Sequence, residues 1–253
     1  MIALSFNDII AVAIAILTIL ALFVSWLVSR SKVRSEMRAI EAVSAVEAFQ
    51  HEAAEKGKRL LFGLGDGLTP QAASVNALAG LGIWRETSAR AVFNDQPAQA
   101  ITGEGSLALL SQMVLRGVYQ DAVAVELFKT EQAQLGGLSA AAGAAGLLPE
   151  VNQPSNAAVI LIGNHSPIAS LAANLAGRKN LPLAAISDTL TAQSAFLISA
   201  PLSTQGEDYY AAQTAFKLQS KAGLQLRALD ILRALTVLAL LIGAVLKLTG
   251  VIP

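Results

Sequence analysis

The hydrophobic pattern sets both ends of the chain apart from its middle. Residues 9–28 contain no charged side chain, and a helix of this length, at about 1.5 Å per residue, crosses a hydrocarbon core of about 30 Å. A second uncharged run, residues 234–246, is shorter and lies between Arg233 and Lys247, whose long side chains can extend toward the headgroups. We therefore predict transmembrane helices within residues 1–30 and 227–253. For the second run, a buried helix of a soluble domain is the alternative.

The charges beside these runs predict their orientation. Four basic residues follow the first run between positions 30 and 38, whereas only Asp8 precedes it. Arg227 and Arg233 precede the second run, and Lys247 alone follows it. Because basic residues stay on the cytoplasmic side, both termini are expected outside and the joining segment in the cytoplasm, at the inner (plasma) membrane. A cleaved signal peptide would instead carry its basic residues before a shorter apolar core.

Residues 31–58 have the pattern of an amphipathic helix. Apolar residues recur every three or four positions, at 33, 37, 40, 43, 46 and 49, among many charged ones. Gly57 is a suitable end for the helix. We expect a stalk that continues from the first membrane helix, with its apolar side turned to the following domain or to a neighbouring copy.

From residue 59 to residue 226, short apolar runs alternate with longer helical patterns. This alternation is typical of βαβ units. The predicted strands are residues 60–64, 98–102, 121–129, 157–162, 183–186 and 195–199, and the predicted helices are residues 70–93, 106–119, 138–147, 167–177 and 208–222. We expect a single Rossmann-like α/β domain of three layers, with a mainly parallel sheet between helices.

One stretch of this domain is nearly free of charge. Between Gly136 and Gly177 the only charged residue is Glu150. Helices in water normally expose a polar face, so helices without one are covered by something else. Other copies of the chain and the surface of the lipid bilayer are the candidates, and we infer a homo-oligomer. A membrane protein is a further candidate partner of the chain.

Composition removes several functional classes. Apolar residues make up 54% of the chain and charged residues 14%, which is outside the usual range of soluble proteins. The absence of cysteine excludes disulfides, thiolate metal sites and thiol nucleophiles. Because 18 basic residues balance 18 acidic ones and aromatic residues are few, we expect no nucleic-acid partner. With two histidines in all, we expect neither a metal site nor a cofactor.

The clearest candidate for ligand binding is a glycine-rich turn. Gly63, Gly65, Asp66 and Gly67 follow a predicted strand and precede a predicted helix, where free backbone N–H groups can hold an anion such as a nucleotide phosphate. The turn lacks the Lys-Ser/Thr pair of a phosphate-binding loop, and Asp66 would repel a phosphate. A tight turn without a ligand is the alternative.

Other polar residues lie at the ends of predicted strands. Glu104, Ser106, His165 and Asp188 would share the edge where α/β proteins bind ligands. They are also ordinary turn and capping residues. Ser106, His165 and Asp188 could form a hydrolytic triad, although Ser106 lacks the usual Gly-x-Ser-x-Gly turn.

Several segments together resemble a known family. The stalk with Ala39-Ile40-Glu41-Ala42, the turn Gly57-Lys58-Arg59, the glycine turn from Gly63 to Leu68 and the closing apolar helix resemble a bacterial family of two-span membrane proteins, known only as a domain of unknown function. The resemblance covers nearly the whole chain and implies two membrane anchors around a cytoplasmic α/β domain. It implies no activity.

These observations order three functional hypotheses. A membrane-anchored structural or assembly protein, which forms a homo-oligomer or a scaffold, agrees best with two anchors and few surface charges. A sensory module that binds a small ligand at the strand-end edge is the alternative. A membrane-anchored hydrolase comes third, so an enzymatic role is the least favoured.

Overall fold

The chain forms two compact units, which we call the sheet unit and the terminal unit. The structure is a computed structural model, and it describes residues 19, 23, 40–66, 74–187, 189–204, 206, 208–209, 212 and 231–237. The sheet unit is Arg38–Lys217, and the terminal unit combines Met1–Met37 with Leu218–Pro253. Within the described residues, no helix has the length and apolar character needed to cross a membrane. The two predicted transmembrane segments lie almost wholly outside the described residues.

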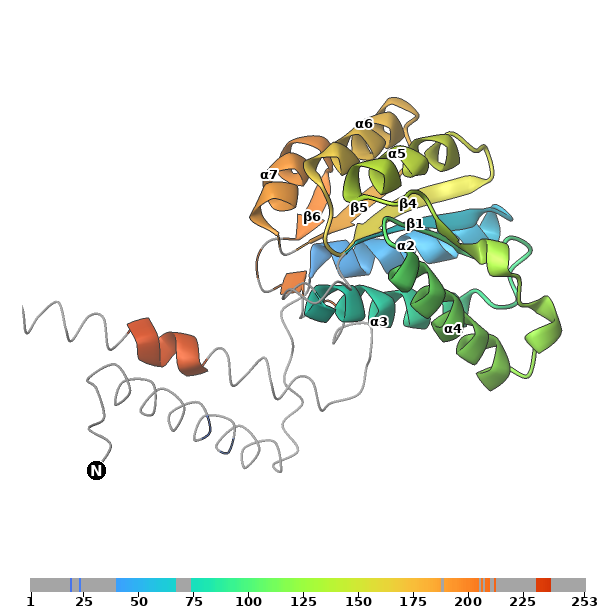
Figure 1. Ribbon diagram of the computed structural model, residues 1–253, viewed down its shortest axis with the longest axis horizontal. Helices are drawn as coiled ribbons and strands as arrows, with labels where there is room; N and C mark the ends of the chain where they lie inside the picture. Colours follow the sequence, from blue (N-terminus) through green and yellow to red (C-terminus); the bar gives the residue numbers. More distant parts are fainter. Residues whose placement is uncertain are drawn as a thin grey trace, which may run out of the picture. The chain divides into compact units, whose positions relative to one another are not determined.

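Six parallel strands form the sheet, in the order β3-β2-β1-β4-β5-β6 (Figure 1). The strands are β1 (Arg59–Gly65), β2 (Gln99–Thr102), β3 (Ala133–Leu135), β4 (Asn156–Ile162), β5 (Leu183–Ile186) and β6 (Leu202–Thr204). This is the order of a doubly wound dinucleotide-binding sheet. The predicted Rossmann-like α/β fold with a parallel sheet is confirmed.

Helices cover both faces of the sheet (Figure 1). On one face lie α2 (Glu41–Glu55), α3 (Ser74–Arg90) and α4 (Gly105–Asp121). On the other lie α5 (Ala140–Val151), the short helix η3 (Pro167–Ala169), α6 (Ser170–Arg178) and α7 (Leu190–Ser199). Two further short helices, η1 (Val125–Leu127) and η2 (Thr130–Gln132), precede β3. The three predicted layers are therefore present.

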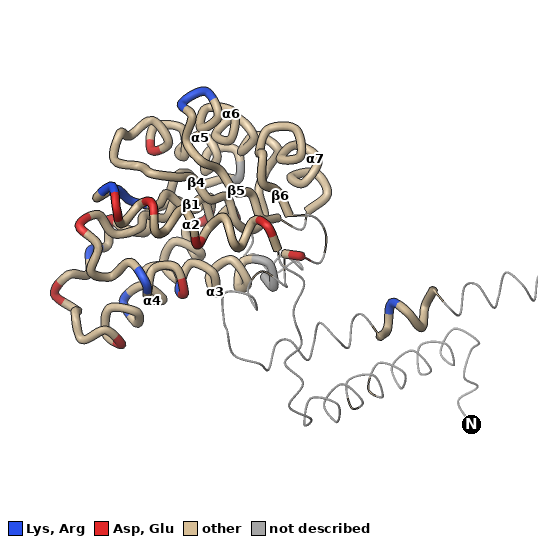
Figure 2. Tube along the Cα trace, turned by 180° about the vertical axis from the view of Figure 1, so that it is seen from behind, with Lys and Arg blue, Asp and Glu red and all other residues tan. Residues whose placement is uncertain are grey.

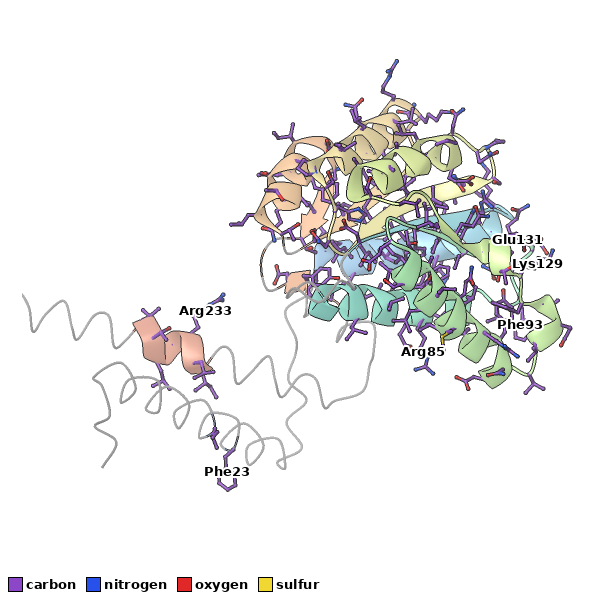
Figure 3. All side chains as sticks on the ribbon, in the orientation of Figure 1. Phe23, Arg85, Phe93, Lys129, Glu131 and Arg233 are labelled. Atoms are coloured by element: carbon purple, nitrogen blue, oxygen red, sulfur yellow. The ribbon has the colours of Figure 1, made fainter. Side chains whose placement is uncertain are left out.

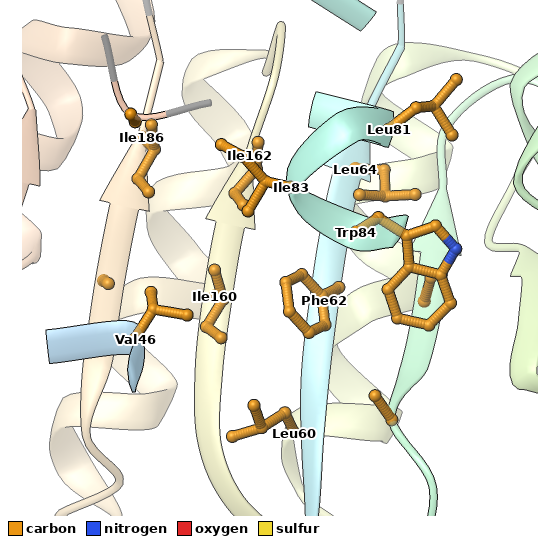
Figure 4. Close-up of a cluster of buried hydrophobic side chains, with 14 of the residues drawn as sticks. Val46, Leu60, Phe62, Leu64, Leu81, Ile83, Trp84, Ile160, Ile162 and Ile186 are labelled. Carbon is orange, nitrogen blue, oxygen red and sulfur yellow. The ribbon is translucent and has the colours of Figure 1, made fainter. Parts of the chain in front are cut away.

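Strand residues alternate between the two helical layers. Leu61, Val159 and Leu161 are buried beneath α5, α6 and α7, whereas Phe62 and Ile160 are buried on the opposite side. Such alternation is the natural consequence of the two-residue repeat of a strand. On the side of α3, the ring of Phe62 meets that of Trp84 edge to face, with centroids 5.1 Å apart (Figure 4).

Helix α2 is part of the sheet unit. Val43 and Val46 are buried in the core that contains β1, β4 and β5, and the Gln50 side chain donates a hydrogen bond to the Thr87 carbonyl of α3. The sequence allowed two partners for the apolar side of this helix, the following domain or a neighbouring copy. In the structure this side packs against the domain. The amphipathic stripe is explained by this packing.

The prediction of a strand at residues 121–129 is wrong. The segment contains the end of α4, a turn with Val123 at a φ of 54° and the short helix η1, and the actual strand β3 lies further along the chain. The alternating Val123, Val125 and Leu127 suggested a strand, but their side chains are exposed, that of Val123 at 88%. Alternation alone does not make a strand where no neighbouring strand accepts its hydrogen bonds.

The prediction of a strand at residues 195–199 is also wrong, because these residues end helix α7. Ala192 and Phe196, four positions apart, are both buried on the same side of that helix. The edge strand β6 follows at Leu202–Thr204, where its backbone pairs with β5. A run of four apolar residues, here 195–198, does not distinguish a short strand from the end of a helix. The predicted helix at residues 208–222 lies mostly outside the described residues.

Helix α5 approaches the ends of β2 and β3 very closely because it carries glycines there. A Cβ atom on Gly143 would lie 2.3 Å from the Cα of Gly103, and one on Gly146 would lie 2.3 Å from the carbonyl oxygen of Gly136. Real Cβ atoms do not come this close to backbone. The small residues of α5 are thus a packing requirement of this layer.

This close approach predicts a contrast between two glycine substitutions. Gly143→Ala should lower the free energy of unfolding by about 2 kcal/mol or more, because α5 must move away from Gly103. Gly117→Ala in the interior of α4, where a Cβ meets nothing within 4 Å, should raise it by about 0.5–1 kcal/mol. Denaturant unfolding of the full chain measures both, and equal effects would contradict the packing described above.

Candidate functional site

The centre of the sheet is where this fold normally binds ligands. From β1 the chain passes through α3 to β2 on one side, and from β4 it passes through α6 to β5 on the other. Because the connections diverge, α/β proteins usually have a crevice between the carboxyl ends of these two strands. The predicted candidates Gly63, Gly65, Asp66 and His165 all lie here.

In this chain a backbone contact joins the two strands at this point. The N–H of Asp66 donates to the carbonyl of Asn164 at 2.9 Å, which joins the end of β1 to the end of β4. Gly65 has a φ of +66°, and a Cβ on it would lie 2.0 Å from the same carbonyl oxygen. Gly163 has a φ of +110°, and its Cβ would lie 2.6 Å from the Leu64 oxygen. These two glycines allow the ends of β1 and β4 to lie in direct backbone contact.

A small pocket lies beside the contact between the ends of β1 and β4. It is lined by the turns that follow β1, β2 and β4 and by the first two turns of α5, and it contains about 220 Å³ of empty space, part of it open to solvent. The enclosed part of this space is only about 10 Å³, which is about the room that one water molecule needs.

Asp66 is the least satisfied polar group of the pocket. Its Oδ1 atom is buried and has no hydrogen-bond partner among the described residues. Burial raises the pKa of the Asp66 carboxyl, a backbone hydrogen bond opposes this effect, and the negative charge of Glu104 raises the pKa further. The site thus holds a carboxylate whose charge is poorly compensated by the described protein.

The surroundings of His165 indicate a role in holding the fold together. Its side chain is only 4% exposed, its Nε2 lies 3.1 Å from the Gly63 carbonyl oxygen, and its ring meets that of Phe196 edge to face. Complete burial lowers the pKa of His165 to about 4, although its hydrogen bonds to backbone carbonyls oppose the shift. At neutral pH the ring is uncharged and joins the end of β4 to β1.

The described contacts do not assemble the hydrolytic triad. Ser106 is exposed in the first turn of α4, and its hydroxyl donates to the Glu104 carboxylate rather than to His165. Asp188 and Gly67 lie outside the described residues. No group of three histidine or acidic side chains that could hold a metal occurs in the described parts of the chain.

Sequence reasoning missed the residues of α5 and β2 that line this pocket. Gly103, which follows β2, and Gly143 and Leu147 of α5 line it together with Asp66. The available signal was the small-residue run of α5, which implies that another backbone approaches closely. The run does not say which backbone it approaches, so the pocket could not be placed from it.

A second candidate site is the outer surface of α5, α6 and α7. These three helices contain two charged residues, Glu150 and Arg178, whereas α2, α3 and α4 contain nine (Figure 2). Glu150 is paired with Arg59 at 3.2 Å. Meanwhile Leu171, Leu197 and Ile198 are exposed, the last at 90%. We call this surface the uncharged layer.

Comparison with known proteins gives a family without a known activity. A family model described as "Domain of unknown function (DUF6754)" matches residues 3–252. The chain belongs to this family. The resemblance to a domain of unknown function over nearly the whole chain is thus confirmed. No curated protein and no solved structure matches this DUF6754 chain, so the functional argument rests on its own residues.

The environment of Asp66 predicts that its negative charge lowers the free energy of unfolding. Asp66→Asn should raise the Tm at pH 7 by about 2–4 °C, because it removes a charge that burial and Glu104 disfavour. The gain should shrink as the pH falls toward 3.8, the ordinary pKa of the group, because the wild-type carboxyl then becomes protonated in both states. Asp121→Asn, at an exposed ion pair with Arg85, is the control and should change the Tm little.

The burial of His165 predicts a pH-dependent stability. Between pH 6.5 and about 4 the unfolded chain binds a proton at His165 that the folded chain does not, so acidification lowers the free energy of unfolding, by about 3 kcal/mol over the whole window. His165→Gln removes this contribution. Denaturant unfolding at several pH values should show the wild type losing stability relative to the variant as the pH falls. A constant difference would refute the assignment.

Proposed function

We propose that this protein is a membrane-anchored assembly protein of a bacterial inner membrane, which forms a homo-oligomer through its sheet unit. In this proposal, membrane helices within residues 1–30 and 227–253 place both termini outside and the sheet unit in the cytoplasm. The uncharged runs at residues 9–28 and 234–246 support the anchors, and the basic residues on their inner sides support the orientation.

The uncharged layer is the observation that carries this proposal. Isolated apolar side chains are common on protein surfaces, but a whole helical layer with only two charged residues is not. Exposed Leu197 and Ile198 lie next to each other near the end of α7, and Leu171 is exposed on neighbouring α6. Burial of these side chains against another molecule removes apolar surface from water, which stabilises association at about 25 cal/mol per Å² before the entropic costs of binding.

A second copy of the chain is the occupant that agrees best with the chemistry of this layer. Large apolar residues with little charge are typical of the centre of homodimer interfaces. The layer offers few charged partners for a strongly charged protein, since Glu150 is already paired with Arg59. A scaffold that binds a different membrane protein through the same surface is the competing outcome.

A small-ligand role at the pocket is the second candidate, and the uncompensated Asp66 carboxylate favours it. Glu104 adds negative charge nearby. A ligand that donates hydrogen bonds or carries positive charge therefore suits this pocket better than the nucleotide or anion that the glycine turn suggested. This role and assembly use different surfaces and are compatible.

The proposal predicts which substitution breaks the assembly. Ile198→Glu places a charge in the uncharged layer and should weaken self-association about 10- to 100-fold, as expected for a buried interface residue. Met113→Glu is the control, because Met113 is 69% exposed but lies on α4, on the opposite face of the sheet from the uncharged layer. Mass photometry of the full chain in mild detergent should show an oligomer for wild type and Met113→Glu and smaller species for Ile198→Glu.

Two results would contradict the proposal separately. A monomeric wild-type chain at every concentration would remove the assembly role. Release of the chain from membranes by an alkaline wash would remove the anchors, whatever the oligomeric state.

A further inference from the structure

The pocket beside the ends of β1 and β4 has a negative charge but no positive one among the described residues that line it. Asp66 is the acidic residue of this lining, which contains no lysine or arginine. His165 lines the pocket too, but its ring is uncharged at neutral pH, and its Nε2 lies against the Gly63 carbonyl oxygen. Glu104 adds a second negative charge nearby. The described residues therefore leave the Asp66 carboxylate without a compensating charge.

One oxygen of this carboxylate limits what can bind beside it. The Oδ1 atom of Asp66 is buried and accepts no hydrogen bond from the described residues. A carboxylate oxygen is only an acceptor, so the group that satisfies it is a hydrogen-bond donor or a cation. A water molecule would satisfy the oxygen and leave the buried charge as it is, whereas a cation would do both. The charge of the pocket thus favours a cation.

The size of the pocket restricts the cation further. Its enclosed part, about 10 Å³, has about the room of one water molecule. Sodium and potassium ions without their hydration shells are comparable in size to a water molecule. A magnesium ion usually keeps several of its waters, for which the enclosed part has no room.

A second oxygen lies next to the Asp66 carboxylate. A Cβ on Gly103 would lie 3.3 Å from the Gly65 carbonyl oxygen and 3.5 Å from the Cβ of Asp66, so both groups border the same space beside Gly103. The Gly65 oxygen accepts a hydrogen bond from the Gly103 N–H at 2.7 Å, and a carbonyl oxygen has a second lone pair. Backbone carbonyls are common ligands of sodium and potassium in proteins.

These ligands suit an ion with a single charge. Calcium takes about 6–8 oxygen ligands, several of them carboxylates. The described parts of the chain contain no group of three histidine or acidic side chains that could hold such an ion. A monovalent ion needs neither histidine nor thiolate, so the composition of the chain does not argue against it.

We infer that the pocket binds a single monovalent cation of the size of sodium or potassium at the Asp66 carboxylate, with the Gly65 carbonyl as a further oxygen ligand. This inference rests on the ligand-binding role proposed above as the second candidate, and it names the ligand of that role. It depends neither on self-association nor on membrane anchoring. Because the ion binds the folded chain, it should stabilise that state.

Thermal unfolding in different chloride salts tests the inference. The full chain in mild detergent is heated at neutral pH in sodium, potassium or tetramethylammonium chloride, at one ionic strength of about 0.15 M, so that the screening of surface charges is the same in all three. Tetramethylammonium carries the same charge but is too large for the enclosed part of the pocket. Tryptophan fluorescence follows the transition, since Trp84 is buried in the core of the sheet unit.

Two pairs of variants locate the effect. Asp66→Asn removes the charge that holds the ion, and Asp121→Asn is its control, because Asp121 forms an exposed pair with Arg85, whose side chain points away from the sheet (Figure 3). Gly103→Ala keeps Asp66 but puts a methyl group into the space beside it, with no contact shorter than 3.3 Å. Gly105→Ala, whose Cβ meets nothing within 4 Å, is the matched control.

We expect the wild type, Asp121→Asn and Gly105→Ala to have a Tm about 2–5 °C higher in sodium or potassium than in tetramethylammonium. Asp66→Asn and Gly103→Ala should show no such difference. The gain in Tm predicted above for Asp66→Asn should accordingly be largest in tetramethylammonium. The sodium NMR line, which reports the ion itself, should be broadened by the wild type and not by Asp66→Asn.

An equal Tm of the wild type in all three salts would overturn the inference. A sodium effect that Asp66→Asn retains would overturn it too, because the ion would then bind elsewhere. Retention of the effect in a folded Gly103→Ala would place the ion outside the pocket, with the same consequence. If Gly103→Ala does not fold, Asp66→Asn decides the outcome by itself.

Methylammonium chloride separates failure of the inference from failure of the ligand-binding role. Stabilisation by methylammonium but not by sodium or potassium, lost in Asp66→Asn, refutes the inference alone, because the pocket then binds the amine end of a larger molecule. Absence of Asp66-dependent stabilisation by any of these cations refutes the inference and also removes the positively charged ligand from the proposed role.

Discussion

Direct contact between the backbones of β1 and β4 organises the centre of this molecule. The strands meet at their carboxyl ends through the hydrogen bond between Asp66 and Asn164. The contact needs Gly65 and Gly163 at positive φ, because a side chain at either position would collide with the opposite strand. The small pocket beside this contact is lined by the turns after β1, β2 and β4 and by α5. The strand order is that of a Rossmann-like domain, which by itself implies no ligand.

The two helical layers differ in chemistry although they cover the same sheet. Helices α2 to α4 carry most of the charge and have an ordinary solvated surface. Helices α5 to α7 lie on the ends of β2 and β3 through glycine contacts and expose leucine and isoleucine instead. The uncharged layer thus lies on one face of the sheet, whereas Asp66 lies at the end of β1.

The candidate polar residues separate into two kinds once their environments are known. His165 is neutral, buried and engaged with backbone, so it contributes to the junction of the central strands. Burial raises the pKa of Asp66, and one oxygen of its carboxylate is buried without a partner among the described residues. Neither feature stabilises the folded protein. The glycine turn that the sequence singled out forms the contact between the central strands and carries this carboxylate.

The sequence alone determined the fold class, because alternating short apolar runs and helical patterns leave few options besides a parallel sheet between helices. It also identified the nearly charge-free stretch from Gly136 to Gly177 and the turn around Asp66. Only the tertiary structure decided that residues 195–199 end a helix and that residues 121–129 form no strand, because strands are defined by neighbours that lie far away in the chain. The backbone contact at the ends of β1 and β4 and the position of the pocket were decided there too, since contacts such as that of Gly143 with Gly103 join residues whose proximity no local pattern records.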